Sequence, residues 1–199
     1  MTTTTSARFR RVSEEPEWAV WLTVLVGLLA GWLVMTAATG RTATAEAGTS
    51  RVIYPAGWVR DAGEEGAIFA VTDVDGGVYG ARASVRQLPK SELAPSAGVA
   101  AEEDAAGWAL IRGQELEGYR VLGITPAQVG GKAALSVEYA YLTDPPLGAS
   151  GSMPGLMHAI DTIVASGEEY YILTVAVEAS ESARLAELQQ QLVAGWQVP

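Results

Sequence analysis

The chain has 199 residues, a formal net charge of −10 at pH 7 and no cysteine. The missing cysteines exclude disulfides, thiolate metal sites and a lipid anchor attached to cysteine. Because an acidic protein is repelled by phosphate backbones, nucleic acid is not expected among its partners.

A long uncharged segment lies near the N-terminus. Residues 18–40 contain no charged side chain and are rich in Leu, Val, Ala and Trp. A helix of this length covers the roughly 30 Å hydrocarbon core of a bilayer. The sequence therefore predicts one transmembrane helix over residues 18–40, with the lipid bilayer as its surroundings.

The flanking charges predict the orientation of this helix. Arg8, Arg10 and Arg11 precede it, whereas the arginines that follow are more widely spread. Because positive charge is retained in the cytoplasm, we expect residues 1–17 to be cytoplasmic and the C-terminal domain to lie outside the cell (inner) membrane, in the periplasm. A cleaved signal peptide is the alternative, since residues 43–47 hold small-x-small patterns. The apolar run exceeds the usual h-region, which favours an uncleaved signal-anchor.

Small residues recur at every fourth position of the predicted helix, namely Ala19, Thr23, Gly27 and Gly31. In lipid, such a stripe lets a second helix approach closely. One interpretation is therefore packing against other membrane proteins, and the other is a simple anchor.

The first elements after the helix are extended. Residues 41–50 are small, polar and unpatterned, which indicates a linker, and residues 51–199 suffice for one domain with a hydrophobic core. Alternation over residues 67–72 and 78–88 predicts a hairpin, with Asp73–Gly77 as its turn.

The spacing of apolar residues becomes helical between residues 96 and 116. Val99, Ala106 and Leu110 share one face of this predicted helix, which leaves Trp108 on the opposite face. Two interpretations of Trp108 stay open. It is either an exposed interface anchor or, if the glycines shift the helix, a core residue.

The rest of the chain alternates again before a final helix. Residues 119–124, 132–143, 158–165 and 170–178 have the period of strands. Residues 180–196 have helical spacing, and their apolar positions are Leu185, Leu188, Leu192 and Trp196. This order predicts an α+β fold in which helices cover an antiparallel sheet.

Several local sequences resemble the PsbP-like family. They are the opening Ile53-Tyr54-Pro55-Ala56-Gly57-Trp58, the Gly130-Gly131-Lys132 start of a strand that ends Glu138-Tyr139-Ala140-Tyr141, the strand 170–177 and the final Gly195-Trp196. The family includes an extrinsic subunit of photosystem II, a Ran-binding protein and bacterial anchored proteins of unknown role. The resemblance implies an α/β/α sandwich over residues 51–199 and a binding or accessory role.

The ionisable residues lack the patterns of catalytic or metal sites, so no cofactor is expected. His158 is the only histidine, and in the predicted strand Asp161 lies on the opposite face, which argues against a zinc site or a triad. Asp73-x-Asp75-Gly starts like a calcium loop but has no closing Glu. The acidic groups Glu64-Glu65 and Glu102-Glu103-Asp104 are interpreted as a solvated loop and helix start, with weak cation binding as the alternative.

Three hypotheses on function follow. The preferred one is a non-catalytic, membrane-anchored accessory subunit whose extracytoplasmic domain docks on a larger membrane complex. The alternative is a carrier or sensor in which the cleft between the sheet and the Gly-rich helix predicted between residues 96 and 116 holds a small apolar molecule, in a pocket beside Trp108 or Tyr141. An enzyme is the third, and it would require paired carboxylates among Glu138, Asp144 and Asp161 to converge.

Overall fold

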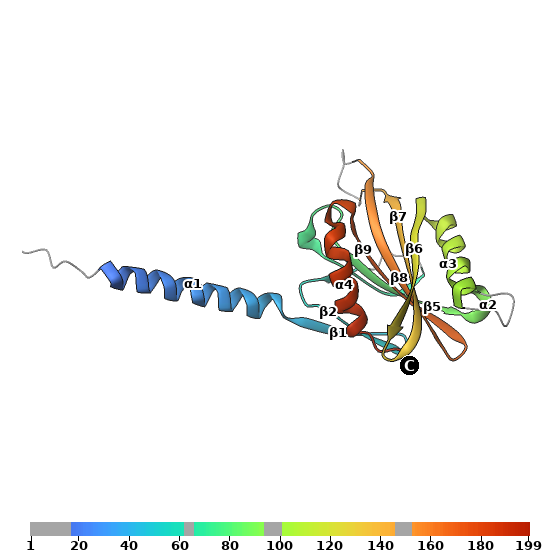
Figure 1. Cartoon of the computed structure of the whole chain (residues 1–199), viewed down its shortest axis with the longest axis horizontal. Helices are drawn as coiled ribbons and strands as arrows, with labels where there is room; N and C mark the ends of the chain where they lie inside the picture. Colours follow the sequence, from blue (N-terminus) through green and yellow to red (C-terminus); the bar gives the residue numbers. More distant parts are fainter. Residues whose placement is uncertain (1–16, 62–65, 94–100, 146–152) are drawn as a thin grey trace, which may run out of the picture. The chain divides into compact units, whose positions relative to one another are not determined.

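The computed structural model describes residues 17–61, 66–93, 101–145 and 153–199 (Figure 1). The chain divides into two units, Met1–Arg41 and Thr42–Pro199. The expectations for residues 1–16, for Glu64-Glu65 and for Val99 lie outside the described residues, as do those for the side chains of Glu102 and Glu103.

The first unit contains helix α1 (Glu17–Thr39). Its stretch Trp18–Thr36 has 19 residues and a mean hydropathy of 2.1, so it is long and apolar enough to cross a membrane. The large apolar side chains of this stretch are exposed. An apolar helix whose Leu, Val and Trp side chains find no protein partner needs an apolar environment.

The second unit is built on a seven-stranded antiparallel sheet with the order β3-β4-β5-β9-β8-β7-β6. The strands are β3 (Val59–Arg60), β4 (Ala67–Thr72), β5 (Arg82–Pro89), β6 (Glu117–Val129), β7 (Lys132–Thr143), β8 (Gly155–Ser166) and β9 (Glu169–Glu178). The predicted antiparallel sheet is confirmed, and β6 is longer than the predicted strand.

Helices cover both faces of the sheet, as the predicted α/β/α sandwich requires (Figure 1). Helix α4 (Ser182–Ala194) packs on β8 and β9 from one side, and helix α3 (Ala101–Glu115) packs on β6 and β7 from the other. The short helix α2 (Lys90–Leu93) follows β5.

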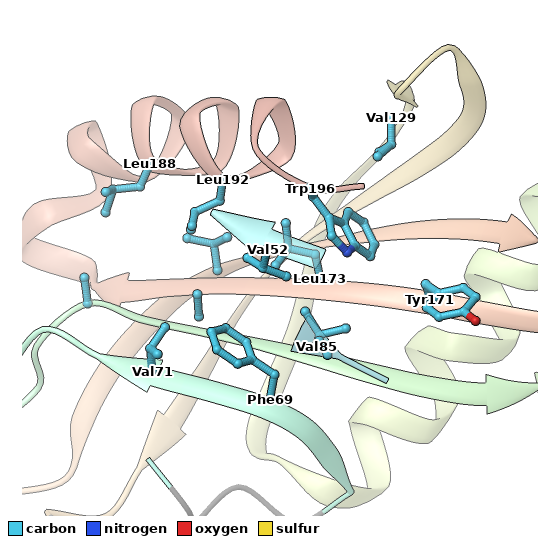
Figure 2. Packing of buried hydrophobic residues seen from close by; sticks show 14 of the residues in the cluster. Val52, Phe69, Val71, Val85, Val129, Tyr171, Leu173, Leu188, Leu192 and Trp196 are labelled. Atoms are coloured by element: carbon cyan, nitrogen blue, oxygen red, sulfur yellow. The ribbon is translucent and has the colours of Figure 1, made fainter. Parts of the chain in front are cut away.

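Most of the side chains buried between α4 and the sheet are apolar. Leu188, Leu192 and Trp196 turn toward Leu173 on β9 and Val52 on the strand β2 (Ser50–Pro55) (Figure 2). The four residues predicted for the apolar face of this helix are all buried, namely Leu185, Leu188, Leu192 and Trp196. Burial of these side chains removes large apolar areas from water and fixes α4 on the sheet.

The predicted linker is partly a strand. Residues 42–47 form β1 (Thr42–Ala47), which pairs with β2 (Ser50–Pro55) in a separate two-stranded sheet. Alternate residues of β1 turn inward, and Ala45 and Ala47 belong to the core on the α4 side. The alternation is carried by Ala against Thr, a contrast in polarity too weak to read as a strand. The second compact unit therefore includes β1 and starts at Thr42.

The predicted hairpin after β4 also differs. The second strand, β5, begins at Arg82 and not at residue 78, and the connection contains a short 3-10 helix, η1 (Val74–Gly76). The Asp73 carboxylate caps η1, and the Tyr79 hydroxyl donates a hydrogen bond to the Met153 carbonyl. Tertiary contacts of this segment thus outweigh its strand-like alternation.

Candidate functional site

A buried polar cluster lies between α3 and the sheet. Trp108 and Arg112 come from α3, four residues apart and so on one helix face, while Tyr139 comes from β7 and Asp161 from β8. All four side chains are buried, and Trp108 and Asp161 have no exposed surface. Charged side chains are rarely buried to this extent unless they are paired.

Hydrogen bonds hold the Asp161 carboxylate on both oxygens. Trp108 Nε1 donates to Oδ2 at 2.5 Å, and the Tyr139 hydroxyl donates to Oδ1 at 2.9 Å. Arg112 Nε lies 3.5 Å from Oδ2, and Arg112 Nη2 donates to the Tyr139 hydroxyl at 3.0 Å. These donors and the guanidinium charge compensate the cost of burying an ionised carboxylate.

The cluster continues outward to Glu115 at the end of α3. Both carboxylate oxygens of Glu115 accept hydrogen bonds from Arg86 on β5, at 3.0 and 2.9 Å, and Arg112 Nη1 donates to Oε2 at 2.9 Å. The guanidinium carbons of Arg86 and Arg112 lie 5.8 and 5.5 Å from the centre of the Trp108 ring. The cluster therefore ties α3 to strands β5, β7 and β8.

The surroundings of this cluster shift several pKa values. Burial, and then the charge of Asp161, raises the pKa of Tyr139 well above its ordinary value and that of Tyr119 to about 12. Burial is the largest single influence on the pKa of Arg112 and lowers it, but Asp161, Tyr139 and Glu115 together raise this pKa above its ordinary value. The two tyrosines therefore keep their protons and Arg112 keeps its charge at neutral pH.

His158 and the predicted carboxylates do not form a joint site. His158 Nε2 lies 2.8 Å from Glu138 Oε1, and both residues are on the face opposite Asp161, because Glu138 alternates with the inward-facing Val137 and Tyr139. Asp144 follows the end of β7. Glu138 and Asp161 therefore point away from each other. Within the described residues, no group of three or more His, Cys, Asp or Glu could hold a metal ion.

Two of the other acidic residues that the sequence singles out, Asp73 and Asp104, have structural partners. The Asp73 carboxylate accepts a hydrogen bond from the Asp75 backbone amide at 3.3 Å and pairs with Arg184 at 3.1 Å. This agrees with a turn rather than with a calcium loop. Asp104 accepts a hydrogen bond from the Tyr170 hydroxyl. Burial, and then Asp104, raises the pKa of that tyrosine.

The small residues of α1 lie along one side of the helix. Thr23 Oγ1 donates to the Ala19 carbonyl at 2.8 Å, and a Cβ at Gly27 or Gly31 would meet no atom within 4 Å. Packing within the chain therefore does not require these glycines. Association of α1 with another helix through Ala19, Thr23, Gly27 and Gly31 stays a prediction.

The predicted face of α3 is wrong. Trp108 is buried, so it is not an exposed interface anchor, and the core interpretation agrees with the structure. Leu110, predicted to face the core, is instead 71% exposed. The inward face carries Arg112, although a pattern of apolar residues predicts that a charged residue faces solvent. The spacing of Trp108 and Arg112 was the available signal, together with Asp161 within an apolar strand.

The carrier hypothesis expects an apolar pocket between the sheet and α3, beside Trp108 or Tyr141. Trp108 and Tyr141 are both packed into the core. Two surface grooves lie in the described part of the domain, and neither is lined by these two residues. One lies between α3 and β6 with a volume of ≈ 770 Å³, and the other lies between the end of α4 and the β6–β7 hairpin with a volume of ≈ 710 Å³.

Comparison with solved structures identifies proteins of the same fold. No family model matches the chain, and no curated protein sequence does. The solved structure of PsbP (CyanoP) from Synechocystis sp. PCC 6803 is similar at 11% identity with a TM-score of 0.55, and it covers 81% of this chain and 94% of its own. The Saccharomyces cerevisiae Ran-binding protein Mog1p is similar at 12% identity with a TM-score of 0.50, over 79% of this chain and 95% of its own. The chain therefore has a PsbP/Mog1-like fold, as its local sequences imply.

Proposed function

We propose that this protein is a non-catalytic, membrane-anchored accessory subunit whose domain docks on a larger membrane complex outside the cytoplasm. The observation that carries the proposal is the combination of an exposed apolar helix, Trp18–Thr36, with a PsbP/Mog1-like domain in one chain. The helix supplies attachment to lipid, and the domain supplies a surface for a partner.

The orientation in this proposal rests on charge. Arg8, Arg10 and Arg11 precede α1, and basic residues beside a membrane helix are retained in the cytoplasm. The domain, which follows α1, then lies on the outer side. The small-residue stripe of α1 gives a second membrane protein a surface on which to pack.

The role as a binding subunit rests on how the ionisable groups are used. Asp161, the His158–Glu138 pair and the Asp73–Arg184 pair each have a structural partner within the domain. One structural neighbour, Mog1p, is a Ran-binding protein, which supports protein partners for this fold. The carrier alternative has less support, because Trp108 and Tyr141 are packed in the core where its pocket was expected.

Extraction of the full chain from its own membranes in a mild detergent tests the proposal. We expect the protein to migrate with other membrane proteins on a native gel, and mass spectrometry of that band should identify them. A protein that migrates only as a lone monomer would contradict the proposal.

The contribution of α1 can be separated with matched variants. Gly27→Ile and Gly31→Ile add bulk to the small-residue stripe where the chain itself has open space. Leu29→Trp adds bulk on the opposite side of the helix. If α1 packs on a partner helix, the glycine variants weaken co-migration and the Leu29 variant does not.

A further inference from the structure

The two edges of the sheet are very different in length. In the part of the chain that the structure describes, β6 pairs with β7 alone and runs for 13 residues, whereas β3 at the other edge has 2 residues. A long edge strand presents a row of unpaired backbone N–H and C=O groups to any other chain, and most proteins keep such edges short. The β6 edge is therefore the one able to accept another strand.

An apolar groove runs along this edge. It lies between α3 and β6, has a volume of ≈ 770 Å³ and is lined by Ala106, Ala109, Leu110, Gly113, Gln114, Tyr119, Arg120, Val121 and Ile124. Leu110 from α3 is 71% exposed and Ile124 from β6 is 41% exposed. Contact with apolar side chains of a partner would remove this surface from water.

The charge of the groove differs from that of the domain. Arg120 is the one charged residue that lines it, and Arg120 makes no ion pair with a described residue. The chain around it is strongly acidic. A carboxylate on a partner would pair with this arginine, whereas a second copy of this acidic chain would be repelled.

Pro126 limits the length of edge that is usable. The β6–β7 hairpin has the two-residue turn Gly130-Gly131, closed by the pair Val129↔Lys132. The residues that close such a turn bond to each other, so Val129 and every second residue before it face β7. Pro126, three residues before Val129, then faces the open edge, where it has no N–H to donate. The usable edge is residues 117–125, and an added strand would have to follow two register shifts within it, between Glu117 and Arg120 and between Val121 and Gly123.

From these features we propose that the β6 edge and the α3–β6 groove bind an extended segment of the partner protein. The segment pairs with residues 117–125 as an additional strand. Its alternate apolar side chains lie in the groove, and an acidic side chain pairs with Arg120. This inference rests on the proposed docking function and names the surface that performs it.

Charge and polarity changes in the groove test the inference on the full chain in its own membranes. Leu110→Glu and Arg120→Glu place a carboxylate in the groove, and both residues are exposed, so the fold should survive. Val59→Glu and Arg51→Glu are matched controls at exposed positions outside the groove. The thermal unfolding midpoint of each variant, followed by near-UV circular dichroism, checks the fold.

We expect the groove variants to lower the amount of co-migrating partner about tenfold or more, and the controls to leave it unchanged. If the complex persists in both groove variants, the groove is not the docking surface, although the proposed function stands. If the wild-type chain forms no complex, the proposed function fails and this inference fails with it.

The occupant itself can be identified by photocrosslinking. A photoreactive amino acid in place of Leu110 should capture one short segment of another protein, apolar in alternation and containing Asp or Glu. The same amino acid in place of Val59 should not capture that segment. Crosslinks from position 110 to lipid alone, or to a second copy of this chain, would overturn the inference.

Discussion

The two faces of the sheet are packed by different chemistry. On one face, Leu188 and Leu192 of α4, with Trp196 just after the helix, pack on aliphatic strand residues. On the other face, α3 packs through Trp108 and Arg112, which bond to partners on two strands. Apolar burial is roughly proportional to area and has little directionality, whereas hydrogen bonds and ion pairs fix position.

This difference explains what each helix leaves on its outside. In α4 the apolar residues recur every three or four positions and so lie on one face of the helix. That face is buried on the sheet, and the polar residues remain on the outer face. The polar anchors of α3 occupy the inward positions, and Leu110 is consequently exposed beside β6. The buried ion pair therefore determines which residues line the α3–β6 groove.

The largest expected effect on stability comes from removing the buried carboxylate beneath α3. Asp161→Ala leaves the Arg112 guanidinium buried without its carboxylate and removes the acceptor of Trp108 and Tyr139. We expect a loss of about 3–5 kcal/mol in the free energy of unfolding. Urea denaturation of the detergent-solubilised chain measures it. A loss below about 1 kcal/mol would show that the cluster does not hold α3.

The apolar face should respond through cavity formation. Leu192 has no exposed surface, and Leu192→Ala removes methyl groups from the core beneath α4. We expect a loss of about 3 kcal/mol by the same denaturation measurement. Glu187→Ala, at an exposed position of the same helix, is the control and should change the stability by less than about 0.5 kcal/mol. Equal losses for both variants would contradict the packing of α4.

Alkaline pH should weaken the α3 face selectively. The pKa of Tyr119 is raised to about 12 in the folded protein, against about 10 in an unfolded chain. The folded state keeps a proton that the unfolded state releases, so this contribution to stability is complete below about pH 10 and is lost as the pH rises toward 12. Unfolding free energies measured from pH 8.5 to 11.5 should fall less steeply for Tyr119→Phe than for the wild type. Identical slopes would contradict the shifted pKa.

The smallest effect on stability is expected on the outside of α3. Leu110→Ser changes a side chain that is 71% exposed, and we expect less than about 0.5 kcal/mol of change in the free energy of unfolding. Trp108→Ala, two residues earlier on the buried face, should destabilise the domain strongly. A large effect of Leu110→Ser would mean that this residue is packed within the domain, and the α3–β6 groove would lose its main apolar surface.

The same comparison explains which features were predictable. Leu185, Leu188 and Leu192 repeat at helical spacing, and apolar burial follows that spacing directly, so the sequence alone predicts α4 and its inward face. The antiparallel strands β7, β8 and β9 are predictable because each is a run of 10 or 12 residues rich in apolar and aromatic side chains, and in β8 and β9 these side chains pack on both faces of the sheet.

The features that were missed depend on contacts distant in sequence. Arg112 is buried because Asp161 lies opposite it on β8, a partner that no local pattern reveals. Strand β1 was missed because its inward residues are alanines, and its pairing with β2 supplies what local propensity does not. The groove at the β6 edge was missed for the same reason. Its apolar side includes Leu110, and Leu110 can be placed on the outside only if Arg112 is known to face inward.

The central claim is that α1 anchors a domain on the outer side of the membrane, and the lack of native cysteine allows a direct test. Single cysteines are introduced by Ala183→Cys, an exposed position of the domain, and by Thr3→Cys before α1. A membrane-impermeant maleimide is then added to intact cells with a permeable outer envelope. The account predicts that position 183 is labelled at once and position 3 only after the membrane is disrupted. Labelling of position 3 but not of position 183, or recovery of the intact chain in the soluble cytosolic fraction, would contradict it.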